Sequence, residues 1–253
     1  MFHQAHVRIR QKLNQQVDVA VRPHLAPRGR SKQREFPNPV APAEVGQFSL
    51  LNLYIPEMES LTHVVLSLCP ERDAVQVLID GKPAPLPYVS AQQINAIVPF
   101  EVAGENAATV QVRTGAAGAV WGIPVAAAQP AIFTADGSGA GQGAVLNQDN
   151  SYNGAANPAA LGSVVQIFAT GIPFAGQVTG SVTSGANNAR NVTVTIGGFD
   201  AAVEFAGPAP GEVAGLVQIN AVIPAGVTPS VAVPILISAG SVVSPVGVTI
   251  GVR

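Results

Sequence analysis

The stretch Gln93-Ile94-Asn95-Ala96-Ile97-Val98-Pro99 recurs later in the chain as Gln218-Ile219-Asn220-Ala221-Val222-Ile223-Pro224. Five of the seven residues are identical, and the other two are exchanges between Ile and Val. The pair therefore indicates an internal duplication and aligns its two copies. Side chains alternate between the two faces of a strand, so Ile94, Ala96 and Val98 are expected to share the side that faces the core.

The amides of this repeat would then face outward or toward an adjoining loop. One interpretation is a side-chain clamp that bonds loop backbone, and the other is a polar strip that binds a ligand. The clamp is favoured because both copies keep the amides, whereas ligand sites often diverge between duplicates. A clamp predicts that Asn220→Ala costs about 1 to 3 kcal/mol. The repeated polar and proline positions are Gln93, Asn95, Pro99, Gln218, Asn220 and Pro224.

The composition points to strands joined by turns. The 26 Gly and 21 Pro together make up about 19% of the 253 residues, against roughly 12% in an average protein. Charged residues are 11%, less than half of the usual ~25%. Gly and Pro are turn residues, and helix-favouring Lys and Glu are scarce, which predicts an all-β chain. No apolar run reaches the ~18 to 20 residues that a membrane span needs.

The two copies run in parallel over more than the repeated heptad. Val75–Ile79 matches Val192–Ile196 at an offset of 117, whereas Asn95 and Asn220 are 125 apart. The second copy therefore holds eight extra residues, which we place in the loop near residues 207–212. Short strands spaced at roughly 8 to 12 residues and repeated as a block predict two β-sandwiches in tandem.

The amino-terminal segment differs from the remainder in charge. Residues 1–35 hold eight of the 13 Lys and Arg and two acids, so they carry +6, and residues 36–253 carry −8. We expect a disordered, basic, Pro-rich leader over 1–43, and it has no signal-peptide core. The first sandwich would span 44–128, and the second 129–253 with a Gly-rich connecting hairpin. Contact with nucleic acid by the leader is the less favoured alternative to a solvated tail.

Over residues 75–253 the chain resembles a known family. This is the uncharacterised C-terminal domain common in secreted Solibacter-type acidobacterial proteins. The motifs that carry the resemblance are Gln-Pro-Ala-Ile-Phe-Thr (129–134), Gly-Gln-Gly-Ala-Val-Leu-Asn-Gln-Asp (141–149), Asn-Pro-Ala (157–159), Gly-Ser-Val-Val-Gln-Ile-Phe-Ala-Thr-Gly (162–171), Val-Thr-Ile-Gly-Gly (194–198), Ala-Gly-Pro-Ala-Pro-Gly (206–211), Ala-Gly-Leu-Val-Gln-Ile-Asn-Ala (214–221) and Val-Thr-Ile-Gly-Val-Arg (248–253).

The resemblance implies immunoglobulin-like units similar to IPT/TIG domains, of the kind found at the end of large extracellular proteins. It implies a secreted or cell-surface location, and a structural, adhesion or ligand-presenting role toward an extracellular protein or polysaccharide. It implies no catalytic residue and no cofactor. The chain departs from the family at its front, where the opening strand is only faintly similar and the basic leader has no counterpart.

Groups that could perform catalysis are sparse. Beyond residue 24 the only histidine is His63, and the only cysteine is Cys69. On one strand these two would be roughly 20 Å apart, because each residue adds about 3.3 Å. A nucleophile needs an adjacent base, so no catalytic dyad is predicted.

Two loops could hold a ligand. Asp136 and Asp149 lie among Ser, Asn and Gly, which suits tight turns and also supplies the oxygen ligands of calcium. Turns are favoured, and the two aspartates stay weak metal candidates. An alternative function is a carbohydrate-binding or hydrolase-associated domain that uses loops 136–153 and 206–212. Tyr88 and Trp121 are the aromatic candidates for sugar stacking, although packing in a core or interface is favoured for both.

Overall fold

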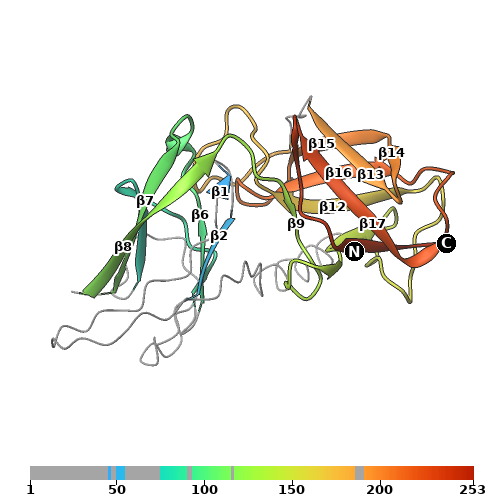
Figure 1. Cartoon of the computed structure of the whole chain (residues 1–253), viewed down its shortest axis with the longest axis horizontal. Helices are drawn as coiled ribbons and strands as arrows, with labels where there is room; N and C mark the ends of the chain where they lie inside the picture. The colour runs from blue at the N-terminus through green and yellow to red at the C-terminus, as the bar shows by residue number, and fades with distance from the viewer. Residues whose placement is uncertain (1–44, 47–49, 55–74, 90–92, 115–116, 186–190) are drawn as a thin grey trace.

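A computed structural model describes residues 45–46, 50–54, 75–89, 93–114, 117–185 and 191–253. In these residues the chain is all-β apart from one 3-10 turn, η1 (Phe100–Val102). The strands form two sandwiches in tandem, which lie side by side in Figure 1. The all-β prediction and the duplication are confirmed. The prediction for the leader 1–43 lies outside the described residues.

The first unit has two sheets. One has the order β1-β8-β7-β3-β4, and the other has the order β2-β6-β5. Strand β1 pairs with β8 in parallel, and the remaining pairs in this unit are antiparallel. The strands are β1 (Val45–Gly46), β2 (Leu50–Tyr54), β3 (Gln76–Ile79), β4 (Lys82–Pro83), β5 (Tyr88–Val89), β6 (Gln93–Ile97), β7 (Ala107–Thr114) and β8 (Ala117–Ala126).

The second unit repeats this plan. One sheet has the order β10-β19-β17-β13-β14 with β18 on β17, and the other has the order β11-β12-β16-β15 with β9 on β12. The strands are β9 (Ala131–Ile132), β10 (Gly141–Gln142), β11 (Val145–Asn147), β12 (Val164–Thr170), β13 (Val192–Ile196), β14 (Phe199–Ala201), β15 (Val203–Pro208), β16 (Val217–Val222), β17 (Ser230–Ala239), β18 (Val242–Val243) and β19 (Val248–Val252).

The strand order of both units is that of an immunoglobulin-like sandwich. In immunoglobulin lettering, β12, β16 and β15 are strands B, E and D, and β13, β17 and β19 are strands C, F and G. The short β10 runs parallel to β19, as β1 runs parallel to β8 in the first unit. The repeated Gln-Ile-Asn segment is therefore strand E of each unit, at the centre of the smaller sheet.

Strand register locates the eight extra residues. In the first unit Val89 pairs with Ile94, which leaves four residues between them. In the second unit Ala206 pairs with Ile219, which leaves twelve. The extra residues thus lengthen the D–E hairpin: β15 and β16 stay paired as far as Pro208 and Val217, and the loop 209–216 follows.

Each unit has its own hydrophobic core. Ile94, Ala96, Val110 and Ile79 are buried in the first core. In the second, Ile219 and Ala221 of strand E lie with Ile167 and Ile235, all fully buried. Ala128 also belongs to the second core, so only Ala127 separates it from the end of β8 at Ala126.

The first copy differs from expectation on the far side of strand E. Asn95 is only 1% exposed and Ile97 only 3%, so both faces of β6 are buried. In the second copy Gln218, Asn220 and Val222 are half-buried, as alternation predicts for a sheet with one covered face. Asn95 is therefore an interior residue and does not face outward.

The core-facing side of β16 should dominate the stability of the second unit. We expect Ile219→Ala to lower the free energy of unfolding by about 2 to 5 kcal/mol, because it leaves a cavity in a fully buried site. Val222→Ala on the other face should cost clearly less. Urea denaturation of the two variants measures both effects, and equal losses would contradict the assignment of the faces.

Candidate functional site

The loop between β10 and β12 is tied together by its own amide side chains. The side chain of Asn153 is buried and uses all of its hydrogen-bonding capacity. Its Nδ2 donates to Asn147 Oδ1 (2.9 Å) and to the carbonyl of Gly251 (2.9 Å). Its Oδ1 accepts from the amide of Gly251 (2.8 Å) and from Gln142 Nε2 (3.3 Å). One side chain thus joins this loop to the last strand, 98 residues further along the chain.

Ser151 is a second hub in the same loop. Its hydroxyl donates to Asp149 and accepts from Asn157 Nδ2 (2.7 Å) and Asn147 Nδ2 (3.3 Å). Asn157 Nδ2 also donates to the carbonyl of Tyr152 (3.0 Å). The polar side chains of this loop that could bind a ligand are therefore hydrogen-bonded to one another.

Gly251 allows the loop to approach β19. A Cβ at this position would lie 2.6 Å from the carbonyl oxygen of Gly154, closer than real Cβ atoms come to any atom. The Asn153 clamp therefore depends on a glycine in the final strand, within the motif that closes the chain.

The two candidate metal aspartates sit in tight turns. Asp136 Oδ1 accepts from the amide (3.0 Å) and the hydroxyl (2.8 Å) of Ser138, and Asp149 Oδ1 accepts from the same two groups of Ser151. These bonds favour the charged carboxylate and lower the pKa of both groups, chiefly through the Ser138 amide for Asp136 and the Ser151 hydroxyl for Asp149. Among the described residues no three His, Cys, Asp or Glu side chains gather where they could hold a metal.

The amides of strand E in the second unit form a line across the sheet. Gln218 Nε2 donates to Asn220 Oδ1 (2.9 Å) and to Gln166 Oε1 (3.4 Å) on β12. Gln166 Nε2 then donates to Asn150 Oδ1 (2.8 Å) in the β11–β12 turn. These amide side chains thus bond to one another across two strands, and the loop is contacted through the side chain of Asn150. The clamp interpretation expected bonds to the backbone of the loop instead. Pro224 begins a turn closed by the Val227 amide, as Pro99 does with the Val102 amide.

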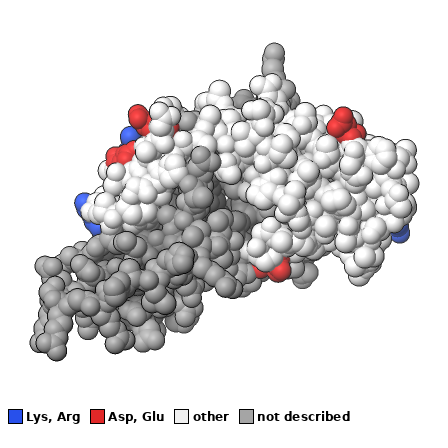
Figure 2. Space-filling view, in the orientation of Figure 1, with Lys and Arg blue, Asp and Glu red and all other residues white. Residues whose placement is uncertain are grey.

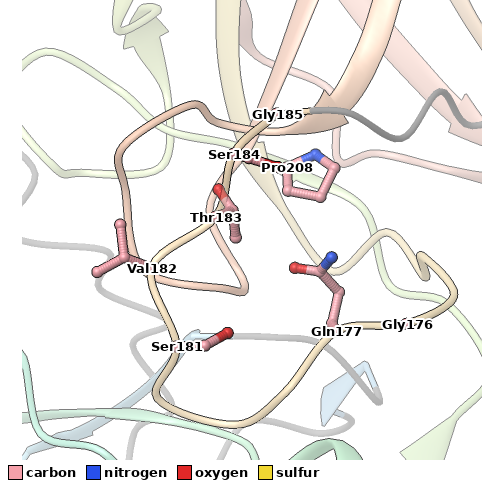
Figure 3. Close-up of a pocket in the computed structure, with 8 residues that line it drawn as sticks. All are labelled: Gly176, Gln177, Ser181, Val182, Thr183, Ser184, Gly185 and Pro208. Carbon is pink, nitrogen blue, oxygen red and sulfur yellow. The ribbon is translucent and has the colours of Figure 1, made fainter.

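The second candidate loop, 206–212, lies in the lengthened D–E hairpin and packs against the B–C loop. Between these loops is a half-open hollow of about 180 Å³. Figure 3 shows Gln177, Ser181 and Thr183 around it, with Pro208 on the hairpin side. The buried Oε1 of Gln177 has no hydrogen-bond partner in the structure. The hollow has room for about six water molecules, and its eight lining residues include neither a charge nor an aromatic ring.

The remaining sequence candidates do not converge on a site. His63, Cys69 and the side chain of Gln93 lie outside what the structure describes. Trp121 packs against the first core with its indole nitrogen buried, so its ring is no open platform for a sugar. Tyr88 is half-buried in β5, opposite Asn95.

Charge is sparse on the surface. The described residues hold eight acids and three bases, which appear as a few isolated patches in Figure 2. Nothing in them forms a basic face of the kind that phosphate backbones require. In this part of the chain no helix has the length and apolar character to cross a membrane.

No protein-family model matches the chain, and no characterised protein matches its sequence. Among solved structures, the I9–I11 tandem of titin is 9% identical over 83% of the chain with a TM-score of 0.24, and the chain spans 62% of its length. Domains 5–6 of the S-layer protein SbsC are 14% identical over 85% of the chain and 98% of theirs (TM-score 0.29). The tandem Ig repeats of Dlar are 13% identical over 83% and 92% (TM-score 0.22). Likenesses this weak say nothing about activity, and the fold follows from the strand order.

Sequence reasoning missed the B–C loop 171–191. It has no motif and no charged residue in its described part, so nothing in its composition marked it. The only sequence signal was indirect. A D–E hairpin that is eight residues longer in one copy is expected to pack against a neighbouring loop.

The Asn153 clamp gives a sharp stability prediction. Asn153→Ala removes the partners of a buried amide and a buried carbonyl on Gly251, so it should cost at least about 2 kcal/mol. Asn157→Ala, at an exposed member of the same loop, should cost under about 1 kcal/mol. Chemical denaturation compares the two, and a harmless Asn153→Ala would show that the clamp does not hold the strand.

The turn at Asp149 should respond to acid. Because its carboxylate is stabilised by Ser151, its pKa should lie below the ordinary aspartate value of about 3.9. That stabilisation is present above the ordinary value and is lost as pH falls through the lowered one. A carboxyl-carbon NMR titration measures the pKa, and Ser151→Ala should raise it; an unchanged pKa would rule out this cause.

Proposed function

We propose that the chain is a non-catalytic structural or adhesion module of a protein that works outside the cell or at its surface. The proposal rests on the hydrogen bonds that polar side chains of the candidate loop 136–153 make within their own unit. Asn147, Asn153 and Asp149 are bonded to side chains and backbone of their own unit, which is the arrangement of a loop built to hold shape. The sparse surface charge supports it, since weakly charged surfaces do not repel neighbouring modules.

We also propose that the chain is related to the Solibacter-type domains it resembles, with its units at 44–128 and 129–253. The fold gives a physical reason for three of the shared motifs. Gly141–Asp149 and Asn157–Ala159 supply the amide network, and Val248–Arg253 carries the glycine that the network holds. A secreted or surface location, and an extracellular protein or polysaccharide as partner, follow from this relationship.

Ligand-dependent thermal unfolding tests the structural role. The midpoint of the full chain should not move when calcium, or soluble oligosaccharides of glucose, galactose and N-acetylglucosamine, are added. A ligand at ~100 times its Kd would stabilise the fold by about 2.7 kcal/mol, which is several degrees. A shift with calcium would overturn the turn interpretation of Asp136 and Asp149. A shift with a saccharide would replace the structural role by the carbohydrate-binding alternative.

A further inference from the structure

The eight extra residues of the second unit lead to a contact with the first unit. We propose that the lengthened D–E hairpin and the B–C loop it supports act as a strut that fixes the angle between the two sandwiches. This inference does not depend on the proposed adhesion role. It assigns a purpose to the eight extra residues of the second D–E hairpin.

The root of the strut is anchored in a small hydrophobic cluster on the outer face of the smaller sheet. Ala209 (1% exposed) and the half-buried Leu216, both in the D–E loop, pack with Phe168 of β12. Phe133 and Leu146 complete this cluster. The hairpin tip therefore has its own apolar anchor and is not a free loop.

The middle of the strut is a short backbone ladder between the D–E loop and the B–C loop. The amide of Thr183 donates to the carbonyl of Glu212 (2.9 Å), and the amide of Ala214 donates to that of Ser181 (2.8 Å). The amide of Gly211 donates to the carbonyl of Thr183 (2.8 Å). The hydroxyl of Thr183 donates to the carbonyl of Ala209 (2.6 Å). Residues 181–183 are thus paired with the hairpin tip through a single antiparallel β-bridge, with Val182 opposite Val213.

The tip of the strut is the turn at residues 178–181, which is closed by hydrogen bonds from the amide and hydroxyl of Ser181 to the carbonyl of Val178. Thr179 projects from this turn. Its hydroxyl accepts from the amide of Phe100 (2.9 Å) and donates to Glu101 Oε2 (2.7 Å). Next to it, a Cβ on Gly180 would lie 3.3 Å from the ring of Pro85 in the first unit.

A single hydroxyl therefore makes two directional bonds to neighbouring residues of the first unit, one of them to a charged carboxylate. Both bonds go to the 3-10 turn that follows the repeated Gln-Ile-Asn strand. The loop bearing Thr179 crosses between the units in Figure 1.

The covalent connection is a second, separate attachment. Ala128 is already in the second core, and the amide of the next residue, Gln129, donates to the carbonyl of Gly171 (2.9 Å). Gly171 has φ +75° and no room for a side chain, since a Cβ would be 1.8 Å from the Gln129 carbonyl oxygen. Relative motion is the default for tandem domains with a small interface. Here a one-residue connection and the Thr179 contact restrain it at two points.

The described residues of the first unit show no equivalent contact. Its D–E hairpin keeps only four residues between paired Val89 and Ile94, too few to extend and support a neighbouring loop. The lengthened hairpin thus occurs in the unit whose B–C loop faces another sandwich.

Distances between spin labels on the two units test the strut in the full chain. Labels are placed at Arg113→Cys and Thr193→Cys, both exposed, in a Cys69→Ser background. The parent should give one narrow distance distribution. Thr179→Val keeps the side-chain shape but removes both hydrogen bonds, and it should broaden the distribution by about twofold. Thr179→Ser should restore the narrow distribution because it keeps the hydroxyl.

Thr228→Val, an exposed threonine far from the junction, is the matched control and should leave the distribution unchanged. A broad distribution in the parent, or an equally narrow one in Thr179→Val, would overturn the proposal. Circular dichroism of each variant guards against unfolding as the cause of broadening. If Thr179→Val lowered the thermal midpoint, Glu101→Gln, which weakens the same contact from the first unit, should reproduce the broadening.

Discussion

Burial of the apolar side of strand E against the opposite sheet of each unit is the constraint on which the rest of the structure depends. Ile94 and Ala96 in one copy, and Ile219 and Ala221 in the other, are fully buried. Asn95 and Asn220 lie between these apolar pairs, so a slip of the strand by one residue would turn an amide side chain into the core. This fixes the register of strands B and D on either side. The same core faces then position strands C, F and G across the sandwich.

The duplication preserved this constraint and changed what lies around it. Both units keep the strand order, the parallel pairing at the sheet edge and the proline-initiated turn after strand E. They differ in the length of the D–E hairpin and in the burial of the strand E amides. Asn95 is interior, whereas Asn220 lies half-buried in a line of side-chain amides. A duplicated core with diverged loops is the expected outcome, because core packing tolerates little change and loops tolerate much.

Much of the fold was predictable from the sequence, for reasons that lie in particular residues. Period-two alternation in the repeated heptad set the core face, and the difference between the offsets 117 and 125 located the extra residues. Asp136 and Asp149 each accept a hydrogen bond from a serine two positions later, and their Ser, Asn and Gly neighbours made a turn the favoured expectation. The Asn153 clamp was not predictable, since it joins residues 98 apart and needs Gly251 to let the loop approach. The contact of Thr179 was equally hidden, because no local pattern distinguishes this threonine from the others in the chain.

We expect the described sandwiches to behave as one rigid tandem, held by the short connection at Ala127 and by the hydroxyl of Thr179. Residual dipolar couplings of backbone amides in both units test this most directly, because they report the orientation of each unit in a common frame. Alignment tensors fitted separately to the couplings of the first unit and of the second unit should have the same magnitude and orientation. Two tensors of clearly different magnitude would show that the units move independently and would contradict it.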